Sequence, residues 1–379
     1  MVETQLAMGD ARIDADSVIN LGADAWSAAV RLRHPGARRL IASLGLSATS
    51  GLGELPNWIG DGSLSLLAHV AGGRDQFAAR DFDLTAARLH VRGNLQFDGA
   101  HKPAKVSGQI NADELVLPLP NWASNVPLPL GILHGWDGEV RVGVGQLILG
   151  EGFVLRDPSA TLSVSADVLR VDMVTASLGA GRLSGHLTCN GAVDPPGISL
   201  NGNLADVSAP ALPYTRQFGL LSGHGNASIT LAASGFSPSA LLATLHGELD
   251  VVLNDGSVAG FDLFRLKRAV QDQDLKAAGV AASDALLNGA TGFDRLKVVA
   301  SISKGELTLD EAGLVGITGV AHATGNMALA DGALDIRLAI QPDIPRAPEL
   351  AIRLTGPIER PTRTPELTAL ARWMADLAR

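Results

Sequence analysis

Residues 334–340 read Leu-Asp-Ile-Arg-Leu-Ala-Ile, an alternation in which every second side chain is aliphatic. In an extended strand successive side chains point to opposite faces, so this stretch predicts a strand with one apolar face. The other face would carry Asp335 and Arg337 in contact with water. One-sided strands of this kind are typical of antiparallel sheets with one solvated face.

The same alternation recurs at residues 161–169, 248–253 and 350–354, and turn signals separate the strand-like runs. Asp-Gly pairs tolerate the positive φ of tight hairpin turns. They occur at 61–62, 98–99, 137–138, 255–256 and 331–332. Leu-Pro-Asn-Trp stands at 55–58 and again at 119–122, which favours a duplicated strand-hairpin unit. We therefore predict a mostly β fold, an elongated and curled antiparallel sheet of repeated strands that forms a groove.

Helical patterns are few and short. Residues 35–46, 261–278 and 365–379 each predict a helix, and the last carries an amphipathic stripe with Pro365 in its first turn. The stripe consists of Leu367, Leu370, Met374 and Leu377. We expect this C-terminal helix to cap an open end of the sheet or to rest on a membrane surface.

The proline-rich stretch 118–131 predicts either a break between subregions or an extended edge segment. Taking it as a break divides the chain into four parts. Residues 1–117 would hold the first strands and the helix near 35–46, and residues 118–235 would continue the groove. Residues 236–364 would form a C-terminal β region, and residues 365–379 the final helix.

Composition excludes several classes of protein. The chain is 46% hydrophobic and only 18% charged, the reverse of a disordered protein. A net charge of −9 gives no positive field to attract nucleic acid. No apolar stretch reaches the ~18 residues of a membrane-spanning helix. Cys189 stands alone, so a disulfide framework is excluded, and a single cysteine fits a reducing compartment as well as a bacterial envelope protein.

The chemistry-bearing residues form no recognised catalytic pattern. The histidines have no metal-ligand spacing, and those beside glycine, such as His134 and His246, suit strand edges. Neither Gly-Asp-Gly at 60–62 nor Gly-Ala-Gly at 179–181 opens a phosphate-binding helix. We therefore expect no catalytic residue, no metal and no cofactor, and a function other than catalysis.

Only 4% of the residues are aromatic, so the apolar faces are mainly aliphatic. Two interpretations follow. The aliphatic faces either pack against each other as a thin core, or stay open as a groove for acyl chains. The side chains that we expect on the apolar face are Leu249, Val251, Leu253, Leu334, Ile336, Leu338, Ile340, Leu350, Ile352 and Leu354.

An ordered set of short motifs resembles the AsmA family of Gram-negative envelope proteins. The C-terminal part of the resemblance comprises 245–249 (LHGEL), 254–263 (NDGSVAGFDL), 291–296 (TGFDRL) and 356–361 (GPIERP). The earlier part comprises 27–46, 81–93 and 182–185. Residues 236–364 would then be the C-terminal region of this family, and the resemblance covers most of the chain.

The resemblance implies an elongated groove that projects into the periplasm from an N-terminal inner-membrane helix. It implies a role in outer-membrane biogenesis and in phospholipid movement between the two membranes, with no catalytic residues. The chain lacks that helix and the first part of the groove. It would be a fragment, start at a misplaced site, or act with an anchored partner.

These features suggest three functions. The first is a lipid-binding and lipid-transfer module at the periplasmic face of the inner membrane, whose ligands are phospholipid acyl chains. The alternative is a scaffold for envelope protein partners that affects outer-membrane protein insertion without carrying lipid. A carbohydrate-binding module needs clustered aromatics, and the tryptophans are scattered along the sequence.

Overall fold

The computed structural model describes residues 2–8, 11–20, 25–37, 39, 62–150, 153–212, 219–271, 274–366 and 368–377. In these residues the fold is mostly β, with a few short helices and a helix near the C-terminus, as predicted. Contacts divide the chain into two compact units. Unit 1 comprises residues 1–177, 184–199 and 235–238, and unit 2 comprises residues 178–183, 200–234 and 239–379.

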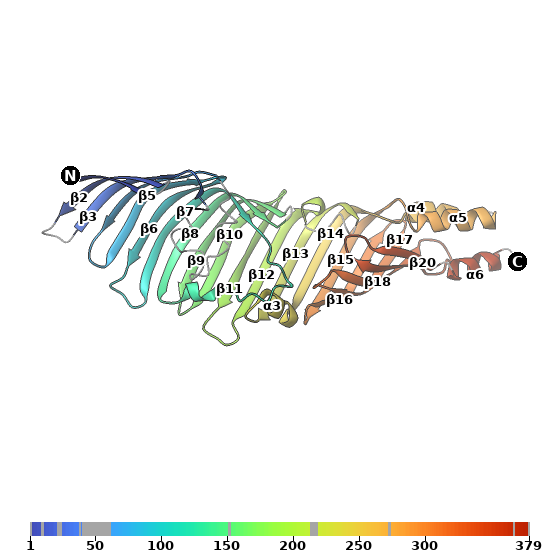
Figure 1. Cartoon of the computed structure of the whole chain (residues 1–379). Helices are drawn as coiled ribbons and strands as arrows, with labels where there is room; N and C mark the ends of the chain where they lie inside the picture. The colour runs from blue at the N-terminus through green and yellow to red at the C-terminus, as the bar shows by residue number, and fades with distance from the viewer. Residues whose placement is uncertain are drawn as a thin grey trace. The chain divides into compact units, whose positions relative to one another are not determined.

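Unit 1 is built on consecutive strands (Figure 1). They are β1 (Val2–Met8), β2 (Ala11–Asn20), β3 (Ala25–His34), β4 (Leu64–Gly72), β5 (Gln76–Ala86), β6 (Leu89–Asp98), β7 (Ala104–Leu117), β8 (Trp136–Leu149), β9 (Phe153–Ser165) and β10 (Val168–Leu178). A short 3₁₀ helix, η1 (Leu130–Leu133), precedes β8. Strands β11 (Gly181–Asn190) and β12 (Gly197–Ser208) contribute residues to both units.

Unit 2 contains the remaining strands and helices of the described chain. They are η2 (Ala209–Ala211), β13 (Leu220–Ser234), α3 (Pro238–Thr244), β14 (His246–Ala259), α4 (Leu263–Ala269), α5 (Leu275–Ala285), β15 (Ala290–Ser303), β16 (Glu306–Gly316), β17 (Gly319–Ala328), β18 (Ala333–Pro342), β19 (Leu350–Pro357), β20 (Thr362–Glu366) and α6 (Thr368–Leu377). Each strand from β13 to β20 pairs antiparallel with the next.

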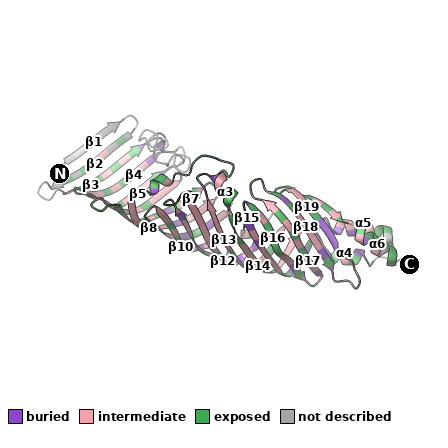
Figure 2. Cartoon of the chain, turned by 90° about the horizontal axis from the view of Figure 1, so that it is seen from below, coloured by how far each residue is buried: buried purple, intermediate pink, exposed green. Residues whose placement is uncertain are grey.

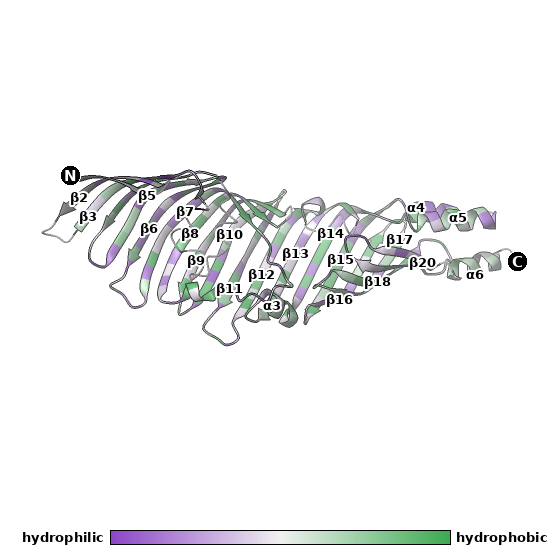
Figure 3. Cartoon of the chain, in the orientation of Figure 1, coloured by the Kyte–Doolittle hydropathy of each residue, from purple (hydrophilic) through white to green (hydrophobic). Residues whose placement is uncertain are grey.

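The strands form where apolar and polar residues alternate, as Figure 3 shows along β13 to β18. In β17, the side chains of His322, Thr324 and Asn326 are exposed on one face of the sheet. Ala321, on the other face, is buried. This arrangement keeps charged groups hydrated and removes aliphatic surface from water. The predicted one-sided strand pattern is therefore present.

One pairing departs from the antiparallel prediction. Strands β7 and β8 run parallel, with Ala104 opposite Trp136 and Leu117 opposite Leu149. A parallel pair needs a crossover of a dozen or more residues, and residues 118–135 supply it. The proline-rich stretch 118–131 is thus part of a crossover connection inside unit 1. The four-part division of the chain stays a prediction.

The Asp-Gly turn predictions are right at two positions and wrong at two others. Asp98-Gly99 lies at the end of β6, and Asp331-Gly332 lies in the turn between β17 and β18. The side chain of Asp331 accepts a hydrogen bond from Ala333 N at 3.0 Å. The pairs at 137–138 and 255–256 lie inside β8 and β14. Asp255 has a φ of 49°, so the chain distorts there but the strand continues, because its partners keep the pairing. Residue 61 lies outside the described residues.

The helix predictions need two corrections. The helix predicted over 261–278 is two helices, α4 and α5, because Asp262 and Asp274 each cap a separate N-terminus. The final helix begins at Thr368, and Pro365 belongs to strand β20, not to the first helical turn. The predicted helix at 35–46 falls mostly outside the described residues.

The hydrophobic core of unit 2 lies where the helices cover the sheet (Figure 2). Leu263, Leu266 and Leu286 are completely buried, and the buried face of α5 consists of small alanines. Thr291 fixes the start of α4 to β15. Its Oγ1 accepts a hydrogen bond from Leu263 N at 3.1 Å and donates one to Phe261 O at 2.8 Å.

Candidate functional site

The apolar face of unit 1 is a set of side-chain rows that cross the strands. One row includes Ile110 and Val142, and each of its members is paired with the next member on the neighbouring strand. The row runs Val30, Ala68, Phe82, Gly93, Ile110, Val142 and Ala160 from β3 to β9. The two neighbouring rows are likewise aliphatic, aromatic or glycine. No charged side chain interrupts these three rows between β3 and β8.

We call the ends of these strands the lower and upper rims, as they appear in Figure 1. The lower rim holds the turns at 73–75, 99–103 and 166–167, and the upper rim holds the turn at 87–88 and Gly150. In the three rows nearest the lower rim, every residue from β3 to β8 is half-buried or exposed. Burial is found near the upper rim, where Leu64 and Ala86 pack with Ala37. The greater part of this face is therefore accessible.

Aromatic side chains occupy the row next to the lower rim. Trp26, Phe77 and Phe97 are 37%, 41% and 43% exposed. The ring centroids of Trp26 and Phe77 are 6.2 Å apart. Gly72 lies between Trp26 and Phe77 in the register. A Cβ atom on Gly72 would meet the Trp26 ring at 2.7 Å, so glycine is required for the ring to lie flat here. These three rings therefore present exposed apolar surface beside the lower rim.

The ten residues predicted for the apolar face all lie on the apolar side of unit 2. Their registers bring them together across the sheet: Ile336 is opposite Leu354, Leu338 opposite Ile352 and Ile340 opposite Leu350. Leu249, Val251 and Leu253 line the same side of β14 and pair with Ala300, Val298 and Leu296 of β15.

Their burial separates them into two groups. Leu253, Ile340, Leu350 and Ile352 are at most 2% exposed and pack in one cluster with residues of the helices, with Val251, Leu338 and Leu354 at its margin. Leu334 is 5% exposed outside that cluster. Leu249 and Ile336 are half-buried and also lie outside the cluster. The helices thus cover one end of the predicted surface.

The solvated face of unit 1, opposite its apolar face, is called the wet face. It carries His90, whose ring is bound by two carboxylates. His90 Nδ1 is 2.7 Å from Asp113 Oδ2, and its Nε2 is 3.1 Å from Asp83 Oδ1. The hydrogen bond to Asp113, with a further one to Asp83, raises the pKa of His90 against the opposing effect of desolvation. The same contact with His90, helped by Arg92, lowers the pKa of Asp113. The cluster therefore ties β5, β6 and β7 together by charge.

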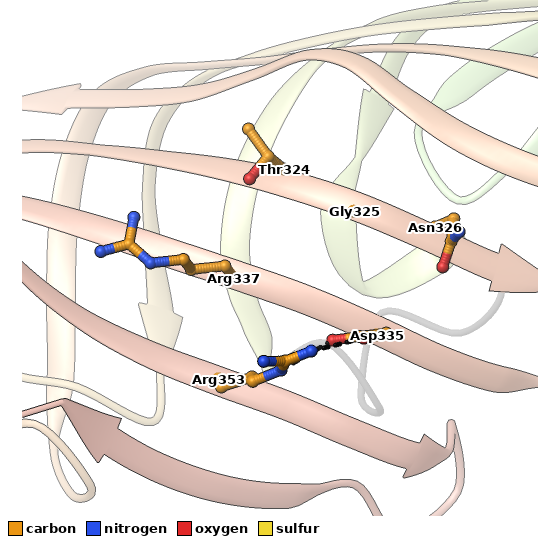
Figure 4. Close-up of a pocket in the computed structure, with 6 residues that line it drawn as sticks. All are labelled: Thr324, Gly325, Asn326, Asp335, Arg337 and Arg353. Atoms are coloured by element: carbon orange, nitrogen blue, oxygen red, sulfur yellow. Dashed lines mark hydrogen bonds and ion pairs between the residues drawn. The ribbon is translucent and has the colours of Figure 1, made fainter.

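A shallow depression on the wet face of unit 2 is lined by polar side chains (Figure 4). Arg353 makes two hydrogen bonds to Asp335, at 3.0 and 2.7 Å, which lower the pKa of that carboxyl. Arg337 is bound to Glu349 and Glu366. Since both cations are neutralised by neighbouring carboxylates, this depression offers no free charge for an anionic ligand.

Side chains suited to metal binding are dispersed. In the described part of the chain, no group of three or more histidine, cysteine or acidic residues is placed to hold an ion. His134 pairs with Asp167 at 2.7 Å, in line with its expected position at a strand edge. We also find, within the described residues, no helix with the length and hydropathy of a membrane span.

A family model described as AsmA family matches residues 100–312, which is more than half of the sequence. The chain belongs to the AsmA family. No curated protein and no solved structure matches it. The AsmA match begins just before β7 and ends within β16. AsmA proteins form a Gram-negative envelope family, so membership confirms the family suggested by the sequence motifs, although those before residue 100 and after residue 312 lie outside the match.

Sequence reasoning located the apolar surface in unit 2 and missed the open face of unit 1 in this AsmA protein. The missed residues include Trp26, Phe77, Phe97, Ile110 and Val142. A signal was present in residues 106–112, where Val106, Gly108, Ile110 and Ala112 alternate with polar residues. It could not show that the face is open, because openness depends on whether a distant element covers it.

Proposed function

We propose that this AsmA protein is a non-enzymatic lipid-binding module that carries phospholipid acyl chains in the periplasm, between the inner and outer membranes. The observation that supports the proposal is the open apolar face of unit 1. The three rows nearest the lower rim have no buried member from β3 to β8, and such a surface would be costly in water. An acyl chain is a ligand that needs such a surface and needs no charged partner from it.

The position of the polar groups agrees with an acyl ligand. Charged residues such as Asp83, Arg92 and Asp113 lie on the opposite, wet face. A ligand with a polar body would leave its hydrogen-bonding groups unpaired against the apolar rows, which is unfavourable. The lipid headgroup would therefore project away from the rows while the chains lie along them.

Transfer of a fluorescent phospholipid between two vesicle populations tests the proposal. Ile110→Asp and Val142→Asp place a charge in the middle of the apolar face, where both residues are half-buried and water can still reach the carboxylate. We expect transfer to fall at least tenfold, because each acyl chain would pass over a charge costing about 1.4 kcal/mol or more. The matched control is Leu67→Asp, which is 45% exposed on the wet face and should transfer normally.

Equal transfer by all three variants would contradict the proposal. Absence of transfer by the folded parent protein would also contradict it and would favour the scaffolding role. In that role the chain would bind envelope proteins that take part in outer-membrane protein insertion, and pull-downs would recover those proteins without lipid.

We also propose a membrane contact by the C-terminal helix, as a separate activity. Its residue Leu370 is buried and Trp373 packs against the core of unit 2, so part of the amphipathic stripe is used for capping. Membrane contact would then depend on the remaining exposed residues. Flotation with phospholipid vesicles, with and without residues 365–379, tests this. Unchanged flotation would contradict it.

A further inference from the structure

The crossover connection between β7 and β8 runs from one rim of unit 1 to the other. At the upper rim, Gly150 N donates a hydrogen bond to Leu117 O at 3.0 Å. At the lower rim, Ala104 N donates to Gly135 O at 3.2 Å. The chain therefore leaves β7 at the upper rim and must return to the lower rim before β8 begins.

It reaches the lower rim at Leu128, whose N donates to Phe236 O at 2.7 Å. Phe236 lies two residues after the end of β13, and Gly235 N donates a hydrogen bond at 2.9 Å to O of Pro196, which directly precedes β12. Residues 118–127 therefore run from the upper end of β7 to the lower ends of β12 and β13, and cross β8 to β11 on the way (Figure 1). We call residues 118–127 the strap.

The handedness of the connection places the strap over the apolar face. The two-residue turn 87–88, in which Ala87 has a φ of 54°, makes Ala86 and Leu89 a hydrogen-bonded pair. Viewed from the apolar face with β7 pointing up, this pairing puts β8 to the right of β7. Parallel crossover connections are right-handed in about 98% of cases, and a right-handed connection here passes in front of the apolar face.

The length of the strap leads to the same face. From Leu117 to Leu128 the chain can reach at most about 36–40 Å, and the turn closed by Ser124 N and Asn121 O shortens this further. Strand β8, with 14 residues, has a contour of ~46 Å. Because the segment is shorter than the strand, it can join the two rims only along a straight path. That path runs on the concave side of the bent strands.

The strap crosses β8 to β11 and lies beside the rows of β3 to β7, and its own side chains remain open to water. All its residues are exposed except Ser124, which is half-buried. Its apolar side chains Leu119, Trp122 and Val126 are 56%, 41% and 70% exposed. The prolines at 118, 120 and 127 restrict the backbone, so the strap keeps its course with little loss of entropy. Two apolar surfaces thus border the same space: the strap, and the half-buried Val140, Val142 and Leu162 of β8 and β9.

We propose that the strap is the outer wall of an acyl-chain passage whose inner wall is the apolar face of unit 1, and that Trp122 contacts the bound chain. This inference rests on the proposed function. It adds that a lipid chain enters this part of the molecule end-on, beneath the strap, and not sideways through an open slot. The exposed apolar side chains of the strap then have a ligand as their partner.

Photocrosslinking tests the contact with three side chains of nearly equal exposure. Trp122 on the strap, Phe97 on the apolar face and Leu67 on the wet face are 41%, 43% and 45% exposed. In three separate full-length proteins, Trp122→p-benzoylphenylalanine, Phe97→p-benzoylphenylalanine and Leu67→p-benzoylphenylalanine are loaded with alkyne-tagged phosphatidylethanolamine. The proteins are freed of vesicles, irradiated and examined by mass spectrometry for covalent lipid.

We expect lipid adducts at positions 122 and 97, at least fivefold above those at position 67. Adducts at position 97 without adducts at position 122 would overturn the strap proposal and leave the proposed function intact. Equal labelling at all three positions would overturn the strap proposal as well, since it would reflect unspecific contact. Absence of bound lipid from all three folded proteins would overturn the proposed function itself.

Discussion

His90 illustrates how one side chain links pH to the stability of unit 1. Its pKa is raised by Asp113 and Asp83, from an ordinary value of 6.5. A raised folded-state pKa stabilises the fold fully below the unfolded value, and this contribution is lost as the pH rises through the folded-state pKa. The pKa of Asp113 is lowered from 3.8, so its contribution is lost as the pH falls. The cluster should therefore stabilise unit 1 most between pH 3.8 and pH 6.5.

The first prediction concerns this cluster. Replacing His90 by glutamine should remove the loss of stability that the parent protein shows as the pH rises from about 5 to about 8. Urea unfolding midpoints of both proteins across that range measure the effect. An equal slope in the parent and in His90→Gln would mean that other groups control the pH dependence.

The second prediction separates open from covered positions on the apolar face of unit 2. Ile340 is completely buried beneath the helices, whereas Ile336, two residues earlier on the same strand, is half-buried outside that cluster. Ile340→Asp should unfold unit 2, because an unpaired buried charge costs more than about 4 kcal/mol. Ile336→Asp should leave a cooperative thermal transition by circular dichroism. Loss of the transition in both variants would show that this face is closed along its whole length.

At the scale of elements, the helices α4, α5 and α6 decide how much of the apolar face of unit 2 is available. Leu266 of α4 is completely buried, whereas Phe264, two residues earlier on the same helix, is 59% exposed. The cap therefore depends on a few inward aliphatic side chains. Leu266→Ala should destabilise unit 2 by about 2–5 kcal/mol, because it leaves a cavity.

Phe264→Ala is the matched control on the same helix, and it should change stability by no more than about 0.5 kcal/mol. Chemical denaturation followed by tryptophan fluorescence compares the two variants, since Trp373 packs against this cluster. A larger effect from Phe264 than from Leu266 would mean that the helix packs through its other face.

Thr291 provides a further prediction for the same cap. Thr291→Val keeps the volume but removes the hydroxyl that joins Phe261 O and Leu263 N. Two buried backbone groups would lose their partner, at a cost of about 1–3 kcal/mol. Thr291→Ser should retain most of the stability, because it keeps the hydroxyl. If Thr291→Val is as stable as the parent protein, water must replace both hydrogen bonds.

The helices and turns also show which features a sequence can predict. Alternation predicted the strands correctly, because a side-chain period of two is imposed by the backbone. The split of residues 261–278 into α4 and α5 was missed, although Asp274 caps α5 through Lys276 N and Ala277 N. The parallel pair β7–β8 was also missed. It depends on where a long connection ends in space, which no local pattern encodes.

At the scale of the whole chain, the two units treat similar apolar faces differently. In unit 1 the three rows nearest the lower rim stay accessible between β3 and β8, and in unit 2 helices cover the row that contains Leu253 and Ile340. The sequence predicted an aliphatic face but left open whether it forms a core or a groove. Part of the apolar face is covered and part is accessible, because covering depends on helices that are distant in sequence.

Native mass spectrometry of the purified full chain, with lipid extraction from the same sample, tests the central claim most directly. The account predicts phospholipid bound to the parent protein and to Leu67→Asp, and a loss of bound lipid in Ile110→Asp. A lipid-free mass from the folded parent protein, together with unchanged folding of Ile110→Asp, would contradict an acyl-binding face in unit 1.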